Sequence, residues 1–397
     1  MTTAAMVVFI AVVGARFLVP LLIPRYPLPA IVAALILDGV DQTIFQTMGY
    51  DPPGYQGYDK AMDVYYLAIA YLSTLRNWTS QPAVHVARFL YFYRLIGVVA
   101  FELTDWRPLL LIFPNTFEYF FIAYEAYRLF WNPARVTKRQ WIITAVAIWV
   151  FVKLPQEWWI HIAQLDVTDT IAEVPWFGPA IVVAVVAICL IYWFAVRPRQ
   201  RPPDWSWHVA ADPLPAAAAT VAERNRWVAA HGRLASGRTV ESVVLVGLIW
   251  VIYAQVLPGV ETGSAQLFAG TAAFVVANAA VSLWVARSAR GVERALPAFA
   301  VRVLMNLAMV WAAGWLLARG GGELSAPHAI FFVLLLSLIT LLESRFRPVY
   351  EIRFAADGPA AGAAAGQRCE GRGNGSDDVA CGPERCELAA GCQAARA

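Results

Sequence analysis

Charged residues are scarce in this chain. Asp, Glu, Lys and Arg make up 15% of its 397 residues, whereas soluble domains usually hold about 25%. Hydrophobic residues reach 59% and the mean hydropathy is +0.54. This balance excludes an ordinary soluble domain and predicts an all-α, polytopic integral membrane helix bundle. The small net charge of +3 gives no reason to expect a nucleic-acid partner.

Several common site motifs are missing as well. The sequence has no H-E-x-x-H, Walker loop or G-x-S-x-G, which excludes the common zinc-protease, nucleotide-binding and serine-hydrolase classes. It holds only five His, so paired axial ligands for a haem bundle are not supported. No Lys lies in 177–196, where a seven-helix retinal protein would carry one. No Lys or Arg precedes Arg16, so the first apolar run reads as a retained helix rather than a secretory signal.

Long apolar runs, by contrast, fill most of the chain. A membrane-spanning helix needs about 20 mostly apolar residues. About eleven segments approach this requirement, and the short or polar ones among them allow a count of about ten to twelve. The predicted spans are 4–23, 29–48, 61–77, 87–103, 108–130, 140–163, 177–196, 241–257, 265–286, 297–318 and 327–343.

Basic residues alternate along the connections between these runs. The loops 131–139, 197–240 and 287–296 are rich in Arg or Lys, whereas 164–176 and 258–264 contain neither. Lys and Arg concentrate in cytoplasmic loops. The pattern therefore predicts a multi-pass protein of the plasma membrane with its N-terminus outside and its C-terminus in the cytoplasm. The Ala-, Arg-, Val- and Gly-rich composition is typical of a bacterial chain.

The predicted organisation has four parts. A seven-helix membrane unit spans 1–196, a basic cytoplasmic linker 197–240, a four-helix membrane unit 241–343 and a tail 344–397. The run AAAATVAERNRWVAAHGRL in the linker predicts a helix, which either lies on the inner membrane surface or serves as a solvated connector.

The tail is of low complexity from residue 355 onward, and this composition favours disorder because it holds few large apolar residues. A metal or redox role is the alternative, because four cysteines lie there. They are Cys369, Cys381, Cys386 and Cys392.

One predicted span carries a stripe of polar side chains. Within 140–163 and just beyond it, Lys153, Glu157, His161 and Gln164 fall within about 80° of one another at about 100° per residue. Lipid cannot satisfy such groups, so the stripe must face protein or water. The alternative is a Lys153–Glu157 pair that only neutralises itself.

The neighbouring spans carry further polar residues. An ionisable group at the membrane centre costs about 2.5–3.5 kcal/mol, so such groups must be paired, protonated, hydrated or coordinated. The spans of the second unit hold few of them. We therefore expect the first unit to hold a ligand-binding or proton-relay site, and the unit 241–343 to offer a surface for a membrane partner. The additional candidates are Asp38, Asp41, Asp63, Arg94, Glu102, Asn115, Glu118, Glu125 and Gln156.

Acids outnumber bases among these residues, which favours transport of a small cationic or zwitterionic solute, or of protons, through an acidic cavity. A second hypothesis is a membrane-embedded enzyme acting on a lipid-linked substrate at the outer leaflet. A third is a non-catalytic subunit of a larger complex. Membrane lipids and a small-molecule or lipid-linked ligand are the expected partners. No cofactor is evident, but a divalent metal could take its ligands from Asp38 and Asp41, or from Glu157, His161, Asp166 and Asp169.

Overall fold

The structure is a computed structural model, and it describes most of the chain. The described residues are 3–47, 55–165, 170–171, 173–205, 207–234, 236–256, 264–287, 300, 303–308, 311 and 326–355. Across these ranges every regular element is a helix and no strand occurs. The all-α part of the predicted fold class is confirmed.

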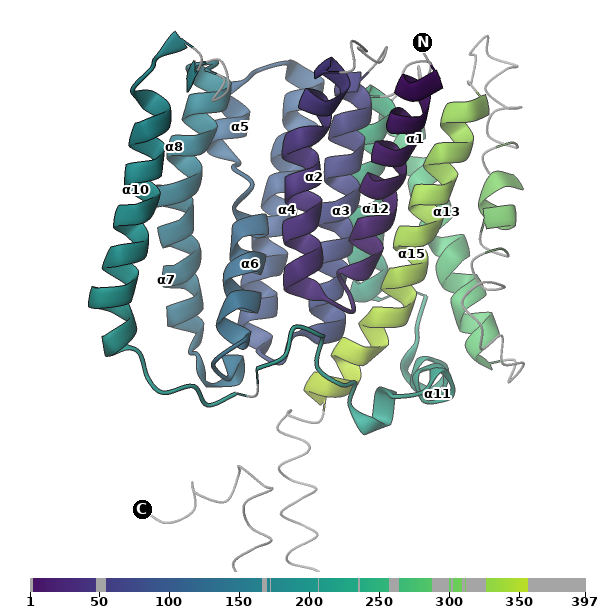
Figure 1. Ribbon diagram of the computed structural model, residues 1–397. Coiled ribbons are helices and arrows are strands. Elements are labelled where there is room, and N and C mark those ends of the chain that lie inside the picture. Colours follow the sequence, from purple (N-terminus) through teal and green to yellow (C-terminus); the bar gives the residue numbers. More distant parts are fainter. Residues whose placement is uncertain are drawn as a thin grey trace, which may run out of the picture. The chain divides into compact units, whose positions relative to one another are not determined.

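The first four long helices lie close to the ranges that the apolar runs predict. They run alternately up and down, side by side (Figure 1). They are α1 (Thr3–Leu18), α2 (Pro27–Thr47), α3 (Tyr55–Asn77) and α4 (Gln81–Thr104). The largest differences are in α4, which begins at Gln81 rather than at residue 87, and in α3, which begins at Tyr55 rather than at residue 61. Its polar first turn is helical, and this brings Asp59 onto the same helix face as Asp63.

The predicted continuous span 108–130 is broken. Helix α5 (Pro108–Ile112) ends before Pro114, and α6 (Thr116–Arg128) begins after it. Proline has no amide hydrogen to donate and disfavours helical geometry in the preceding residue. The break therefore places Asn115 at the N-terminal end of α6, where its side chain donates a hydrogen bond to Glu118.

Wider helical turns interrupt the predicted span 140–163. It consists of α7 (Lys138–Ile148), a π-helical segment (Trp149–Lys153), α8 (Leu154–Glu157) and a second π-helical segment (Trp158–Ile162). Pro155 cannot donate the usual amide hydrogen bond one turn back, which accounts for the irregularity. The π-helical segments turn less per residue than an α-helix, so a wheel drawn for an α-helix misplaces the residues at the far end.

Two segments among the described residues are long and apolar enough to cross a membrane. They are Gln81–Thr104, with a mean hydropathy of 1.4, and Phe177–Arg199, with 2.6. The second contains α10 (Phe177–Ile191), and none of its most apolar stretch is buried against the rest of the chain. Length and composition alone support membrane association here.

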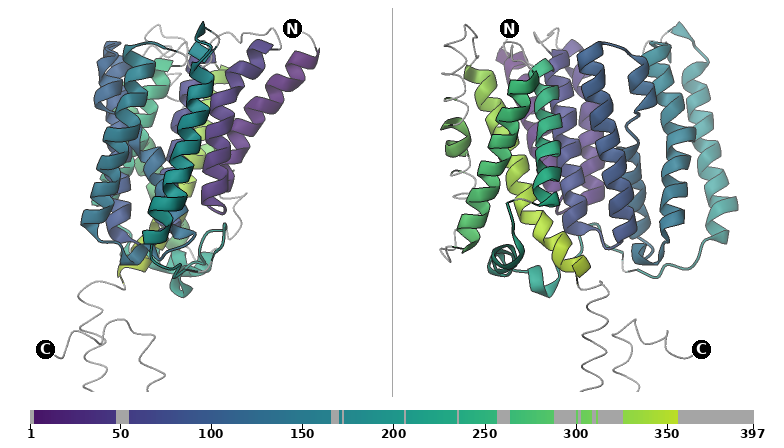
Figure 2. Two further views of the ribbon diagram at one scale, coloured as in Figure 1. Left: turned by 60° about the vertical axis from the view of Figure 1, so that its left-hand side comes forward. Right: turned by 180° about the vertical axis from the view of Figure 1, so that it is seen from behind.

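After the linker, one helix packs onto the first four and a second packs onto it. Helix α12 (Gly237–Val256) packs against α3, α4 and α13 (Ser264–Arg287). The Tyr253 hydroxyl of α12 donates a hydrogen bond to the Ala61 carbonyl of α3 over 3.0 Å. Both views in Figure 2 show these helices aligned with the common axis of the bundle.

The last long helix, α15 (Ala326–Ala355), runs well past residue 343, where the sequence predicts the end of a span. An ion pair of 3.0 Å between Glu343 and Arg347, one turn apart, supports the extension. Val349 and Ile352 also pack against Ala218 of the linker. The remainder of the predicted tail, with its four cysteines, and most of the predicted span 297–318 lie outside the described residues.

The helix predicted in the linker is α11 (Val221–His231), which packs against α13. Thr220 and Glu223 cap its first turn reciprocally. Hydrogen bonds from the Thr220 backbone and hydroxyl lower the pKa of the Glu223 carboxyl. Helix α11 lies at the end of the bundle opposite the N-terminus (Figure 1).

Candidate functional site

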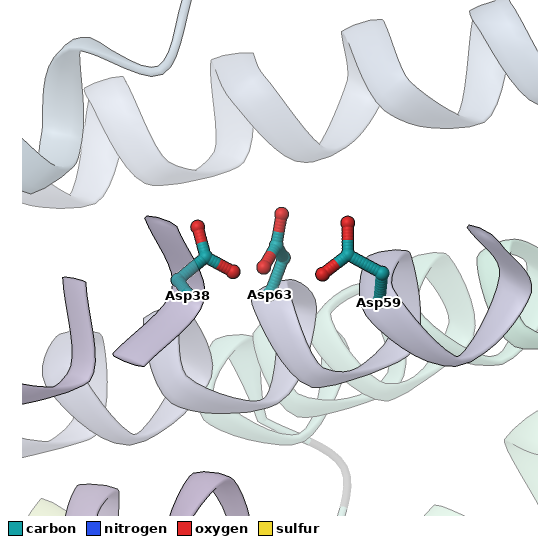
Figure 3. Close-up of side chains that lie close together, drawn as sticks. All are labelled: Asp38, Asp59 and Asp63. Carbon is teal, nitrogen blue, oxygen red and sulfur yellow. The ribbon is translucent and has the colours of Figure 1, made fainter. Parts of the chain in front are cut away.

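Four carboxylates meet one buried guanidinium between α1, α2 and α3. Arg16 of α1 contacts Asp38 and Asp41 of α2, and it contacts Asp59 and Asp63 of α3 at 2.5 and 2.9 Å. Arg16 is 4% exposed and Asp41 is wholly buried. The side chains of Asp38, Asp59 and Asp63 converge in Figure 3. We call these five residues the Arg16 cluster.

Helical spacing explains why these acids converge. Asp38 and Asp41 lie three residues apart on α2, and Asp59 and Asp63 lie four apart on α3, so each pair occupies one helix face. Carboxylate oxygens of Asp38, Asp59 and Asp63 lie within 4.8 Å of one another. Two unit charges at that distance repel by about 3.5 kcal/mol at an effective dielectric constant of about 20. One guanidinium therefore leaves a surplus of negative charge that favours a proton or a second cation.

A second group of polar residues surrounds Glu157. Its carboxylate lies 3.0 Å from His161 Nε2 and 3.8 Å from Lys153 Nζ. Lys153 also donates a hydrogen bond of 3.0 Å to Gln156 Oε1 and lies 4.3 Å from the ring centroid of Tyr119. Lys153 and Glu157 are buried, whereas His161 is half-buried. We call Lys153, Gln156, Glu157 and His161 the Glu157 cluster.

Glu118 and Asn115 connect the two clusters. The Tyr66 hydroxyl donates to Glu118 Oε1 at 2.8 Å, and Asn115 Nδ2 donates to Glu118 Oε2 at 2.9 Å. The Asn115 backbone N–H then donates to Glu157 Oε1 at 3.1 Å. Tyr66 follows Asp63 by three residues on α3, so both side chains lie on one helix face. A line of polar groups thus leads from the Arg16 cluster to the Glu157 cluster.

One acceptor on this line is unsatisfied. The side-chain oxygen Oδ1 of Asn115 is buried and has no hydrogen-bond partner within the described part of the chain. A buried polar atom without a partner costs free energy, and a water molecule or an ion commonly supplies the missing contact. Asn115 sits at the break that Pro114 creates, so the break and the unsatisfied oxygen occur at the same place.

Some sequence-predicted residues belong to local pairs instead. Glu102 accepts a hydrogen bond of 3.0 Å from Lys60. Arg94 donates to the Phe113 carbonyl at 3.0 Å, which stabilises the chain where α5 ends. The Lys60–Glu102 contact lies beside the network, whereas the charge of Arg94 also acts on Glu118 and Glu157.

Glu125 lies in a separate group, where both of its carboxylate oxygens accept hydrogen bonds. It accepts hydrogen bonds of 2.8 Å from both Trp78 Nε1 and Arg128 Nε. Arg128 in turn lies 3.1 Å from His208 Nε2 and 3.3 Å from Asp212 Oδ1. These contacts attach His208 and Asp212 to α6, which favours a structural role for Glu125.

The structure separates Gln164 from the stripe on which the helical wheel places it. The second π-helical segment ends at Ile162, and Gln164 is exposed with a left-handed φ of 53°. The interruption by wider turns accounts for this difference. Asp166 and Asp169, the other predicted metal-ligand candidates, lie outside the described residues.

The predicted site residues did not include Arg16, Asp59 or Tyr66. A signal for Arg16 was available, because it is the only Lys or Arg in the first apolar run and therefore needs an acidic partner. Asp59 was overlooked because the predicted helix began two residues after it. Tyr66 could be placed beside Asp63 from the sequence, but its contact with Glu118 depends on how α3 and α6 pack.

No protein-family model, curated protein or solved structure matches this chain. Its function is therefore inferred from the residues and geometry described above.

Proposed function

We propose that this chain is a multi-pass protein of the bacterial plasma membrane that moves protons or a small cationic solute through the Arg16 cluster. About eleven spanning helices would place the N-terminus outside and the C-terminus in the cytoplasm. The common direction of the long helices (Figure 1) and the outward-facing apolar side chains of Phe177–Arg199 support a membrane setting. The Arg-rich linker helix α11 lies at the end opposite the N-terminus, in agreement with the predicted orientation.

The surplus of carboxylates around Arg16 is the observation that carries the transport proposal. Among the described residues, four acids contact the same guanidinium, and three of them approach one another within 4.8 Å. An arriving proton or cation would relieve their repulsion, and Arg16 would release one carboxylate as the new charge binds. When no other cation is bound, Arg16 thereby reduces the repulsion among the four carboxylates but does not neutralise their total charge.

The line through Tyr66, Glu118 and Asn115 supplies a route away from this cluster. Each of these residues offers a hydrogen-bonding group, and His161 at the far end is half-buried. A hydroxyl, two carboxylates and an imidazole are groups through which protons commonly pass in membrane proteins. Protons therefore suit the whole line, whereas a larger cation would need the side chains to move apart.

Proteoliposomes containing the purified chain test this proposal. An imposed inside-negative potential should drive proton entry, read by an enclosed pH-sensitive dye, or accumulation of a radiolabelled small amine. Asp38→Asn and Asp63→Asn should each reduce the flux at least about tenfold while leaving the protein folded. Asp204→Asn is the matched control, because it removes an exposed carboxylate that pairs with Arg135. Flux no greater than in protein-free liposomes for both probes would overturn the proposal.

A membrane-embedded enzyme with a divalent metal is the alternative, and one observation favours it. Carboxylate oxygens of Asp38, Asp59 and Asp63 are close enough to share one ion, and hard cations prefer oxygen ligands. The Arg16 guanidinium contacts the same three carboxylates, so an ion does not fit while Arg16 keeps this position. Saturable Mn²⁺ binding, together with chemical change of a lipid-linked substrate and no flux, would favour the enzyme.

A further inference from the structure

A cavity of about 240 Å³ lies at the α11 end of the bundle, between α11, α12, α13 and α15. Five arginines line it: Arg224 and Arg233 from the linker, Arg238 from α12, and Arg345 and Arg347 from α15. It shares no residue with the Arg16 cluster or the Glu157 cluster. We call it the basic cavity.

Two of these arginines have acidic partners. Arg347 forms ion pairs of 3.0 Å with both Glu343 and Glu241, and Arg238 contacts Glu351. Even so, the terminal nitrogen Nη2 of the buried Arg347 has no hydrogen-bond partner among the residues that the structure describes. A buried N–H donor on a cation calls for an acceptor, and an anion is the strongest one.

The other three arginines have no ion-pair partner among the residues that the structure describes. Within the described ranges, no carboxylate lies within ion-pair distance, 4.0 Å, of Arg224, Arg233 or Arg345. Arg224 donates hydrogen bonds to the Ala218 and Ala219 carbonyls. Burial lowers the pKa of Arg224 and Arg345, and the charge of Arg345 lowers that of Arg224 further. These like charges would be relieved by a bound anion.

One wall of the basic cavity is apolar. Val275, Ala279 and Leu283 follow one another at four-residue intervals on α13, so they form a stripe on one helix face. Leu341 of α15 and Val228 of α11 also line the cavity. An arginine-rich side next to an apolar stripe matches a molecule with an anionic headgroup and a hydrocarbon chain. A free inorganic ion would contact the arginines but would gain no favourable contact with the apolar stripe.

We propose that the basic cavity binds an anionic phospholipid of the inner leaflet. Arg224, Arg233 and Arg345 hold its phosphate, and one acyl chain follows the Val275–Ala279–Leu283 stripe of α13 toward the membrane. Basic pockets between helices on the cytoplasmic side are a common means of binding such headgroups. A volume of about 240 Å³ is below the roughly 300–1,000 Å³ of drug-sized ligand sites, which suits a compact headgroup whose chains extend outside.

Binding of short-chain lipids to the purified full-length protein in mild detergent tests the proposal. Dioctanoyl phosphatidylglycerol should bind saturably, and dioctanoyl phosphatidylcholine, whose headgroup carries no net charge, should bind at least about tenfold more weakly. Inorganic phosphate should not compete at equal concentration. Equal binding of the two lipids would overturn the proposal, and so would competition by phosphate at equal strength, which would assign the cavity to a free anion.

Matched variants locate the binding. Arg224→Gln combined with Arg345→Gln should weaken phosphatidylglycerol binding at least about tenfold. Arg226→Gln is the control, because Arg226 lies on the same helix α11 but is exposed and does not line the cavity. Ala279→Phe should weaken lipid binding by filling the apolar wall, while all variants keep the Tm of the unaltered protein. If Arg226→Gln and the double variant weaken phosphatidylglycerol binding equally, the lipid is attracted to the basic surface in general, and the assignment to the basic cavity is overturned. Because the cavity is separate from the Arg16 cluster, this result is independent of any transport measurement.

Discussion

Replacing Arg16 with glutamine would leave Asp38, Asp41, Asp59 and Asp63 without their shared cation. Removing one partner from a buried ion pair costs about 3–5 kcal/mol. Neutralising one aspartate with a proton at pH 7 costs about 4 kcal/mol, from an ordinary pKa of about 3.9 and about 1.36 kcal/mol per pH unit. Both estimates agree, so we expect Arg16→Gln to reduce the free energy of unfolding by about 3–5 kcal/mol at pH 7. Such a loss is a large part of a typical total stability of about 5–15 kcal/mol.

The assay is denaturant unfolding in detergent, followed by tryptophan fluorescence at pH 7 and pH 5. At pH 5 the same arithmetic reduces the cost of protonating an aspartate to about 1.5 kcal/mol. The deficit of Arg16→Gln relative to the unaltered protein should therefore shrink as the pH falls. Arg135→Gln is the control, because Arg135 pairs with Asp204 at 2.6 Å but is 67% exposed. It should change stability by no more than about 1 kcal/mol.

A double variant separates charge from packing. Arg16→Gln with Asp41→Asn removes the wholly buried acid and should recover part of the lost stability. Unfolding of Arg16→Gln that matches the unaltered protein at pH 7 would refute the counterion role of Arg16. A deficit that neither pH 5 nor Asp41→Asn reduces would show that the size and shape of the arginine matter more than its charge.

Three further predictions concern other parts of the chain. Glu157→Gln should abolish transport with Tm nearly unchanged. Lys153→Met should lower stability by about 3–5 kcal/mol, because it removes a buried cation 3.8 Å from the buried Glu157 carboxylate. Strong destabilisation by Glu157→Gln that Lys153→Met restores would instead mark the pair as structural. With the native cysteines replaced, a cysteine at Thr170 should react with a membrane-impermeant thiol reagent in intact cells and one at Ala217 should not; the reverse labelling would invert the orientation. Deleting 358–397 should leave thermal stability in detergent unchanged, because low-complexity sequence buries little apolar surface; zinc that co-purifies only with the full chain would assign the tail to metal binding.

The sequence alone indicated the helical class, and it located most helices within a few residues. Long apolar runs leave few alternatives to a helix, because backbone N–H and C=O groups away from water must form hydrogen bonds within their own segment. The helical periodicity of the sequence also placed Lys153, Glu157 and His161 on one helix face, and the structure brings these three residues together. The same periodicity failed for Gln164, because local π-helical turns change the rotation per residue.

Only the tertiary structure decided which polar residues belong together. Local patterns showed acids in several spans, but they could not show that Asp38 and Asp63 share Arg16 while Glu125 is already satisfied by Arg128 and Trp78. These partners are separated along the chain, and their contact depends on which faces of packed helices meet. The spacing of polar residues along the sequence specifies which face of a helix they occupy. Whether such a residue joins a neutral pair or a cluster with surplus charge depends on which helix faces pack together.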